Sequence, residues 1–155
     1  MTEYYKEKLE AGLQFQDYVV DKLRKYDPMF IVNLYGSKKW QNQKGESSSG
    51  LEIKYDMRMH ETGNLYIEVA EKSNPDNPNY VPSGIYRNDN TIFYLIGNYD
   101  QAFLFGKYQL QKLYEHDECH KSRGIKKIET PTSLGFVYPI EDAMRGYCLF
   151  RYDFT

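Results

Sequence analysis

Several features that would place a chain at once in a class of proteins are scarce in this sequence. Two cysteines in 155 residues cannot form the disulfide framework of a small secreted domain. No window approaches the roughly 18 consecutive apolar residues that a membrane span requires, so no membrane role is expected. The N-terminus resembles neither a signal peptide nor a transit peptide. We therefore expect a cytoplasmic protein.

An excess of charge of either sign is also missing, because 20 Lys and Arg nearly balance 22 Asp and Glu, for a formal net charge of −2. Without a large basic field, any contact with nucleic acid would depend on local patches. The apolar content of 41% and charged content of 27% are typical of a folded globular protein. Tyrosine is in clear excess, with 16 residues. The length predicts a single domain over residues 1–155.

Apolar periodicity predicts a mixed α/β (α+β) order of elements. A first amphipathic helix covers roughly residues 3–26, with Gln16 at the centre of its apolar stripe. Two strands, 51–56 and 65–70, are expected to form a β-hairpin around a turn at 61–64. The other expected elements are strands at 29–35, 91–96, 101–105 and 125–129, helices at 107–119 and from 140, loops at 36–50 and 129–139, and a final run at 147–152. This order predicts a mixed sheet flanked by helices.

Charged residues recur at every second position of the predicted hairpin and therefore share one face of it. The expected cross-strand pairs are Asp56 with Glu68, Lys54 with Ala70, and Glu52 with Lys72. Two adjacent carboxylates offer hard oxygen ligands to a divalent metal, and a nearby ammonium could orient a water at a phosphodiester. The spacing alone is equally compatible with an exposed hairpin whose charges form cross-strand salt bridges.

At these residues the chain resembles a known family of nucleases. The stretch Gly50-Leu-Glu-Ile-Lys-Tyr-Asp56, followed by Gly63-Asn-Leu-Tyr-Ile-Glu68, is similar to the metal-binding hairpin of the PD-(D/E)XK nuclease superfamily, and in particular of its small phage and mobile-element members. Residues 82–86 and 132–140 resemble later stretches of such proteins. The resemblance implies a restriction-endonuclease-like fold and a DNA endonuclease that hydrolyses phosphodiesters with Mg²⁺ or Mn²⁺.

The resemblance also implies roles for individual residues. Asp56 and Glu68 would be the metal ligands. The lysine of the superfamily's motif should stand two residues after Glu68, where this chain has Ala70. Lys54, expected across the hairpin from Ala70, is the first candidate to supply the missing catalytic ammonium, and Lys72 is the second.

Two further residues are candidates for a supporting role around the metal. The acidic residue of the family's first helix falls on Gln16, whose amide could bond a metal-bound water or could serve packing alone. Glu52 is expected to be the ion-pair partner of Lys72 or an outer ligand. The departures at Ala70 and Gln16 leave an alternative: a catalytically inactive nuclease-fold protein of a phage or mobile element that binds nucleic acid or inhibits a host protein.

Contacts with DNA are expected from basic and aromatic side chains outside the hairpin's centre. The candidates are Lys38, Lys39, Trp40, Lys44, Arg58, His60 and Arg87, with Tyr80 and Tyr86 as further substrate contacts. Tyr55 and Tyr66 are expected to pack on the sheet face opposite the carboxylates. A homodimer is expected, because cutting two DNA strands with one site per subunit requires two subunits. A host or phage protein is a further possible partner. A zinc site at His116, Cys119 and His120 is set aside for want of a fourth ligand.

Overall fold

A computed structural model gives the structure of the protein and describes residues 3–26, 41, 43–116 and 125–155. The chain divides into two compact units, each with its own strands and helices. The first unit comprises Met1–Met57, Asp89–Leu104 and Phe150–Thr155, and the second comprises Arg58–Asn88 and Phe105–Leu149.

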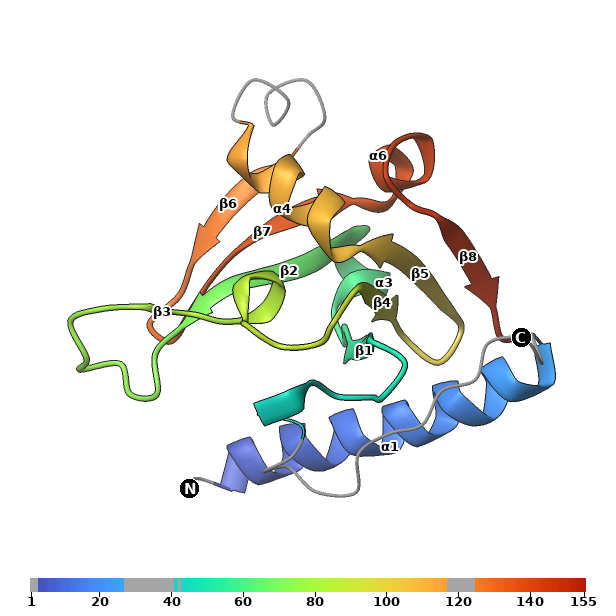
Figure 1. Ribbon diagram of the computed structural model, residues 1–155, viewed down its shortest axis with the longest axis horizontal. Coiled ribbons are helices and arrows are strands. Elements are labelled where there is room, and N and C mark those ends of the chain that lie inside the picture. Colours follow the sequence, from blue (N-terminus) through green and yellow to red (C-terminus); the bar gives the residue numbers. More distant parts are fainter. Residues whose placement is uncertain (1–2, 27–40, 42, 117–124) are drawn as a thin grey trace. The chain divides into compact units, whose positions relative to one another are not determined.

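The first unit is built on a four-stranded sheet with the order β1-β4-β5-β8 (Figure 1). Its elements are α1 (Glu3–Tyr26), β1 (Leu51–Tyr55), β4 (Phe93–Gly97), β5 (Gln101–Gly106) and β8 (Phe150–Asp153). Strand β1 runs parallel to β4, whereas β5 and β8 are antiparallel. The sheet is therefore mixed, with β1 and β8 at its edges.

Helix α1 packs its apolar stripe on this sheet, as the sequence predicts. Phe15, Val19 and Leu23 are fully buried in a cluster that includes Leu51 and Ile53 of β1. Burial of such side chains contributes about 2 kcal/mol each, which is far more than helix propensity supplies. The core of this unit consequently lies between α1 and one face of the sheet.

The second unit is built on an antiparallel sheet with the order β3-β2-β7-β6. Its elements are α3 (Met59–Thr62), β2 (Asn64–Glu71), β3 (Val81–Pro82), the 3₁₀ turn η1 (Gly84–Tyr86), α4 (Lys107–Glu115), β6 (Lys126–Glu129), β7 (Ser133–Pro139) and α6 (Ile140–Arg145). Leu65, Ile67 and Val69 of β2 are buried, while the residues between them are half-buried. Tyr114 of α4 stacks on Phe136, the β7 partner of Ile67, so α4 covers this apolar face.

The mixed α/β class is confirmed, but the strands form two sheets rather than the one expected. The predicted hairpin is wrong, because β1 pairs with β4 and β2 pairs with β7 and β3. The residues between β1 and β2 form α3, which ends at Gly63 in the left-handed conformation (φ 67°). A local turn signal predicts that the chain reverses, but burial of the apolar face decides which strands pair.

The predicted loop at 129–139 is also wrong, since Ser133–Pro139 is strand β7. Gly135, which suggested a loop, lies opposite Glu68 in the sheet. A Cβ there would overlap the Ile67 carbonyl and the ring of Tyr66, so the glycine makes room for a tyrosine across the strands. The strand expected at 29–35 lies outside the described residues.

The helices that the structure describes lack the length and apolar character of a membrane span. Each of them is either too short or too polar to cross a bilayer, including the 24-residue α1.

Two glycines with positive φ offer a test of how closely η1 approaches β2. A Cβ added to Gly84 (φ 51°) would overlap the Glu68 backbone, whereas a Cβ added to Gly63 (φ 67°) would meet no other atom within 4 Å. We expect Gly84→Ala to lower the free energy of unfolding by about 2–4 kcal/mol, from conformational strain plus overlap, and Gly63→Ala by about 1 kcal/mol, from strain alone. Urea denaturation measures both, and equal losses would show that the close approach is absent.

Candidate functional site

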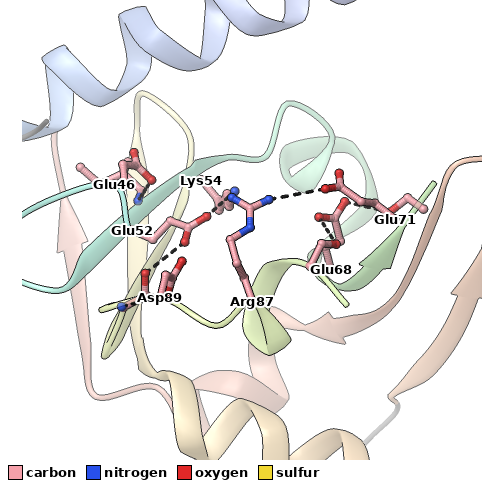
Figure 2. A network of polar contacts seen from close by, with 11 residues as sticks. Glu46, Glu52, Lys54, Glu68, Glu71, Arg87 and Asp89 are labelled. Atoms are coloured by element: carbon pink, nitrogen blue, oxygen red, sulfur yellow. Dashed lines mark hydrogen bonds and ion pairs between the residues drawn. The ribbon is translucent and has the colours of Figure 1, made fainter. Parts of the chain in front are cut away.

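Polar side chains gather on two strands, one in each unit (Figure 2). The first set lies on and beside β1 and includes Glu52 and Lys54. The second lies on and beside β2 and includes Glu68. Each set is held by contacts within its own unit.

The first set centres on a buried ion pair. The Glu52 side chain is only 4% exposed, and its Oε1 lies 2.5 Å from Nζ of Lys54, whose side chain is 42% exposed. The buried hydroxyl of Thr91 donates to the other oxygen, Oε2, at 3.3 Å. Both oxygens of Glu52 therefore have partners, and the structure pairs Glu52 with Lys54 rather than with Lys72.

The strand's alternation explains why these charges lie together. Leu51 and Ile53 point toward α1, so Glu52 and Lys54 point to the other side of the sheet. Asp56 continues this phase just after β1, and its N–H donates to the Gly97 carbonyl at 2.8 Å. The prediction that these three charged residues share one face is consistent with the structure.

The free edge of β1 is covered by residues that the sequence reading missed. Glu46 Oε2 accepts the Ile53 N–H at 3.0 Å. The Ser47 hydroxyl accepts the Leu51 N–H at 3.0 Å and donates to the Leu51 carbonyl at 2.7 Å. Glu46 and Ser47 are buried, so the expected surface loop is wrong at these positions. The only available signal was the general need of an edge strand for hydrogen-bond partners.

Gln16 and Tyr55 lie on the α1 side of this sheet. Gln16 is buried, with 8% exposed, within the stripe that packs toward β1. Tyr55 stacks on Phe15 with ring centroids 4.7 Å apart, as predicted for the face opposite the charges. Glu52 and Lys54 point to the opposite side of the sheet. This arrangement favours a packing role for Gln16 over a contact with a metal-bound water.

The second set centres on Glu68, whose carboxylate is held by hydroxyl groups. The Ser83 hydroxyl donates to Oε1 at 2.8 Å, and the Ser133 hydroxyl donates to Oε2 at 3.1 Å. The Tyr66 hydroxyl lies 2.6 Å from that of Ser133. Burial raises the pKa of Tyr66, and its hydrogen bond with Ser133 opposes that rise. The prediction for Tyr66 is therefore wrong: two residues apart on one strand, Tyr66 and Glu68 share a face.

The structure does not produce the expected cross-strand pairs. Glu68 lies opposite Gly135, and Ala70 lies opposite Leu134 and Pro82. The pairings of Asp56 with Glu68 and of Lys54 with Ala70 are wrong, since β1 and β2 belong to different sheets. Lys72 instead places its ammonium 4.3 Å from the ring centroid of Tyr80.

Arg87 follows η1 on a backbone that α4 holds in place. Lys107 Nζ donates to the Arg87 carbonyl at 2.6 Å, and the Gln111 amide donates to the Ile85 carbonyl at 2.7 Å. The Arg87 guanidinium forms an ion pair with Glu71 at 3.6 Å (Figure 2). A fixed arginine near a sheet edge can contact a phosphate, although Glu71 competes for it.

Tyr80 and Tyr86 use their hydroxyls inside the protein. The Tyr86 hydroxyl donates to Glu115 Oε1 at 3.0 Å, and burial together with that carboxylate raises the pKa of Tyr86. The Tyr80 hydroxyl donates to the Thr130 carbonyl. These contacts favour a packing role over the predicted substrate contact.

The remaining candidates for DNA contact differ in their surroundings. Arg58 and His60 are exposed. They were expected to extend from the strand that begins at residue 51, but they lie at the start of α3. Lys44 is exposed. Lys38, Lys39, Trp40, Cys119 and His120 lie outside the described residues.

A divalent metal can be tested against the donor groups on β1. Glu52 and Asp56 both carry the hard oxygen atoms that Mg²⁺ prefers, but four residues of extended chain, about 13 Å, separate their Cα atoms. Within residues 3–26, 41, 43–116 and 125–155, no three His, Cys, Asp or Glu side chains are grouped closely enough to hold a metal. A Mg²⁺ ion at β1 would consequently keep most of its waters and depend on substrate phosphate, as is common for this ion.

Comparison with known proteins adds no relative. No protein-family model, no curated protein and no solved structure matches the chain. Function is therefore inferred from the residues and their geometry.

The buried pair on β1 can be tested with a double-mutant cycle of Glu52→Gln and Lys54→Met. We expect a coupling of about 1–3 kcal/mol in the free energy of unfolding, because removing Lys54 alone leaves a buried charge without this partner. The exposed pair Asp21 and Lys25, 2.8 Å apart with side chains 62% and 71% exposed, is the control and should give about 0.5 kcal/mol or less. Equal couplings would contradict the burial of Glu52.

Proposed function

We propose that the chain is a metal-dependent DNA endonuclease that hydrolyses phosphodiester bonds. The observation that carries this proposal is the placement of Glu52 and Lys54 on β1 and of Asp56 directly after it, with the Glu52 carboxylate almost fully buried. Buried ion pairs are weak contributors to stability, and ionisable groups in costly environments are concentrated at functional sites. A carboxylate that can hold a metal and a nearby ammonium are groups that metal-assisted hydrolysis uses.

Each group on β1 has a role in this proposal. Asp56 would hold Mg²⁺ or Mn²⁺, which when bound would activate a water and neutralise charge on the scissile phosphate. Glu52 would keep the Lys54 ammonium in place through its ion pair. Lys54 would donate a hydrogen bond to a phosphate oxygen or to the attacking water. Glu68, the other acid that the family resemblance suggests, remains a candidate ligand on β2, and Lys72 a candidate second ammonium.

Contacts with the DNA backbone would come from basic side chains outside these strands. Arg87 has a fixed backbone and a long ion pair, and Lys44 and Arg58 are exposed. Because the net charge is −2, binding would rest on such local groups and would weaken with added salt. We further propose a cytoplasmic homodimer, since one site per subunit cuts one strand.

A second function is favoured by one specific observation. Ala70 replaces the motif lysine, and Lys54 does not face it, because the two residues lie in different sheets. A chain without a lysine next to Glu68 could bind nucleic acid, or inhibit a host protein of a phage or mobile element, without cleaving DNA.

A cleavage assay separates the two functions. Purified protein with Mg²⁺ or Mn²⁺ should nick or cut plasmid and single-stranded DNA, and EDTA should abolish the activity. We expect Asp56→Asn and Glu52→Gln each to lower the rate roughly 100-fold or more, because the first removes a ligand charge and the second removes the ion-pair partner of Lys54. Glu68→Gln, assayed in parallel, shows whether β2 takes part.

The matched control is Glu141→Gln, an exposed carboxylate in the first turn of α6, which should cut like wild type. DNA binding without cleavage by wild-type protein would favour the inactive alternative. Cleavage that survives in both the Asp56 and the Glu52 variants would exclude a β1 site.

A further inference from the structure

Strand β8 forms an edge of the first unit's sheet, and within the described part of the chain it pairs with β5 alone (Figure 1). Its hydrogen-bonding phase is set by the Phe154 N–H, which donates to the Asp100 carbonyl at 2.8 Å. Because bonded and non-bonded residues alternate in an antiparallel pair, Tyr152 also directs its backbone groups to β5. The N–H and C=O groups of Arg151 and Asp153 therefore point away from β5, along the outer edge of the sheet.

The side chains of β8 alternate in the same way. Tyr152 and Phe154 are buried in the core beneath α1, whereas Arg151 and Asp153 are exposed on the other face, with a guanidinium nitrogen 2.7 Å from Asp153 Oδ1. Phe150 shares the face of Tyr152, and their ring centroids lie 4.7 Å apart. Phe150 is nevertheless 56% exposed, so this edge presents an aromatic ring beside its outward backbone groups.

The order of residues along β8, Phe150-Arg-Tyr-Asp-Phe154, is complementary to itself when it is read in reverse. In an antiparallel pairing of two copies about a two-fold axis at Tyr152, Arg151 lies opposite Asp153 of the partner subunit. Phe150 then lies opposite Phe154 of the partner subunit. The hydrogen-bonding phase agrees, since Arg151 and Asp153 are the residues whose backbone groups point outward.

Charge also selects this register over its neighbours. A two-fold axis at Arg151 would set two arginines opposite each other, and an axis at Asp153 would set two aspartates opposite each other, which is unfavourable. Charged residues on an edge strand usually prevent pairing with another chain. Here the two charges have opposite signs, and a two-fold axis forms every cross-strand pair twice. The same residues that would repel most strands therefore suit a second copy of β8.

We propose that β8 is the contact surface for a second copy of this chain, which joins two four-stranded sheets into one continuous sheet. The inference gives the proposed homodimer a surface, but it rests on the geometry of β8 and not on DNA cleavage. A strand pair of a few residues buries less area than a standard interface. We therefore expect a dimer that dissociates on dilution.

Sedimentation velocity of the full chain over a range of concentrations measures this association. Arg151→Glu sets two acids opposite each other, and Asp153→Arg sets two arginines opposite each other, so we expect each to raise the dimer Kd roughly 10-fold or more. The control is Lys8→Glu, which should leave the Kd unchanged. This exposed lysine lies about 21 Å along α1 from Lys22, whose ammonium donates to the Phe154 carbonyl.

A mixture of the two single variants gives the sharpest test. Chains with Arg151→Glu are complementary to chains with Asp153→Arg, since every cross-strand pair between them joins an acid to an arginine. An equimolar mixture should regain a dimer with a Kd within about threefold of wild type. Loss of the ion pair within one strand, which both variants share, cannot produce this recovery. Circular dichroism melting establishes that each variant is folded.

The outcomes separate this inference from the proposed function. Wild type that stays monomeric up to about 1 mM, single variants that dimerise as wild type does, or a mixture that does not associate overturns the inference. A wild-type dimer that neither variant weakens would place the interface elsewhere and leave the proposed homodimer in force. Dimerisation through β8 by a chain that cleaves no DNA leaves this inference intact and removes the endonuclease proposal. Cleavage by a chain that stays monomeric gives the reverse result.

Discussion

The packing of α1 on β1 is the constraint on which the candidate site depends. Burial of Leu51 and Ile53 beneath the helix fixes the phase of the strand, and a strand has only two faces. Glu52, Lys54 and Asp56 must then lie on the opposite side from α1. A shift of one residue would place the charged side chains against Phe15 and Leu23, at a cost no ion pair could offset.

The two carboxylates of interest are satisfied in different ways. Glu52 is buried beside an ammonium and a threonine hydroxyl, so its charge is balanced locally. Glu68 instead accepts a hydrogen bond from a serine hydroxyl on each of its oxygens.

The tyrosine excess also acquires a structural explanation. Tyr55 stacks its ring on Phe15, and Tyr66, Tyr80 and Tyr86 direct the hydroxyl to a partner within the protein. Tyrosine combines a large apolar surface with one polar atom, which suits half-buried positions at strand ends and between helix and sheet.

The sequence alone determined the mixed α/β class, the first helix and its buried stripe, and the shared face of Glu52, Lys54 and Asp56, because all of these follow from local periodicity. Only the tertiary structure decided that β1 pairs with β4, that residues 133–139 form a strand, and that Ser83 and Ser133 meet at Glu68. Partner strands and hydroxyl donors come from positions far apart in the chain. Their selection depends on how apolar faces are buried together, which no local pattern records.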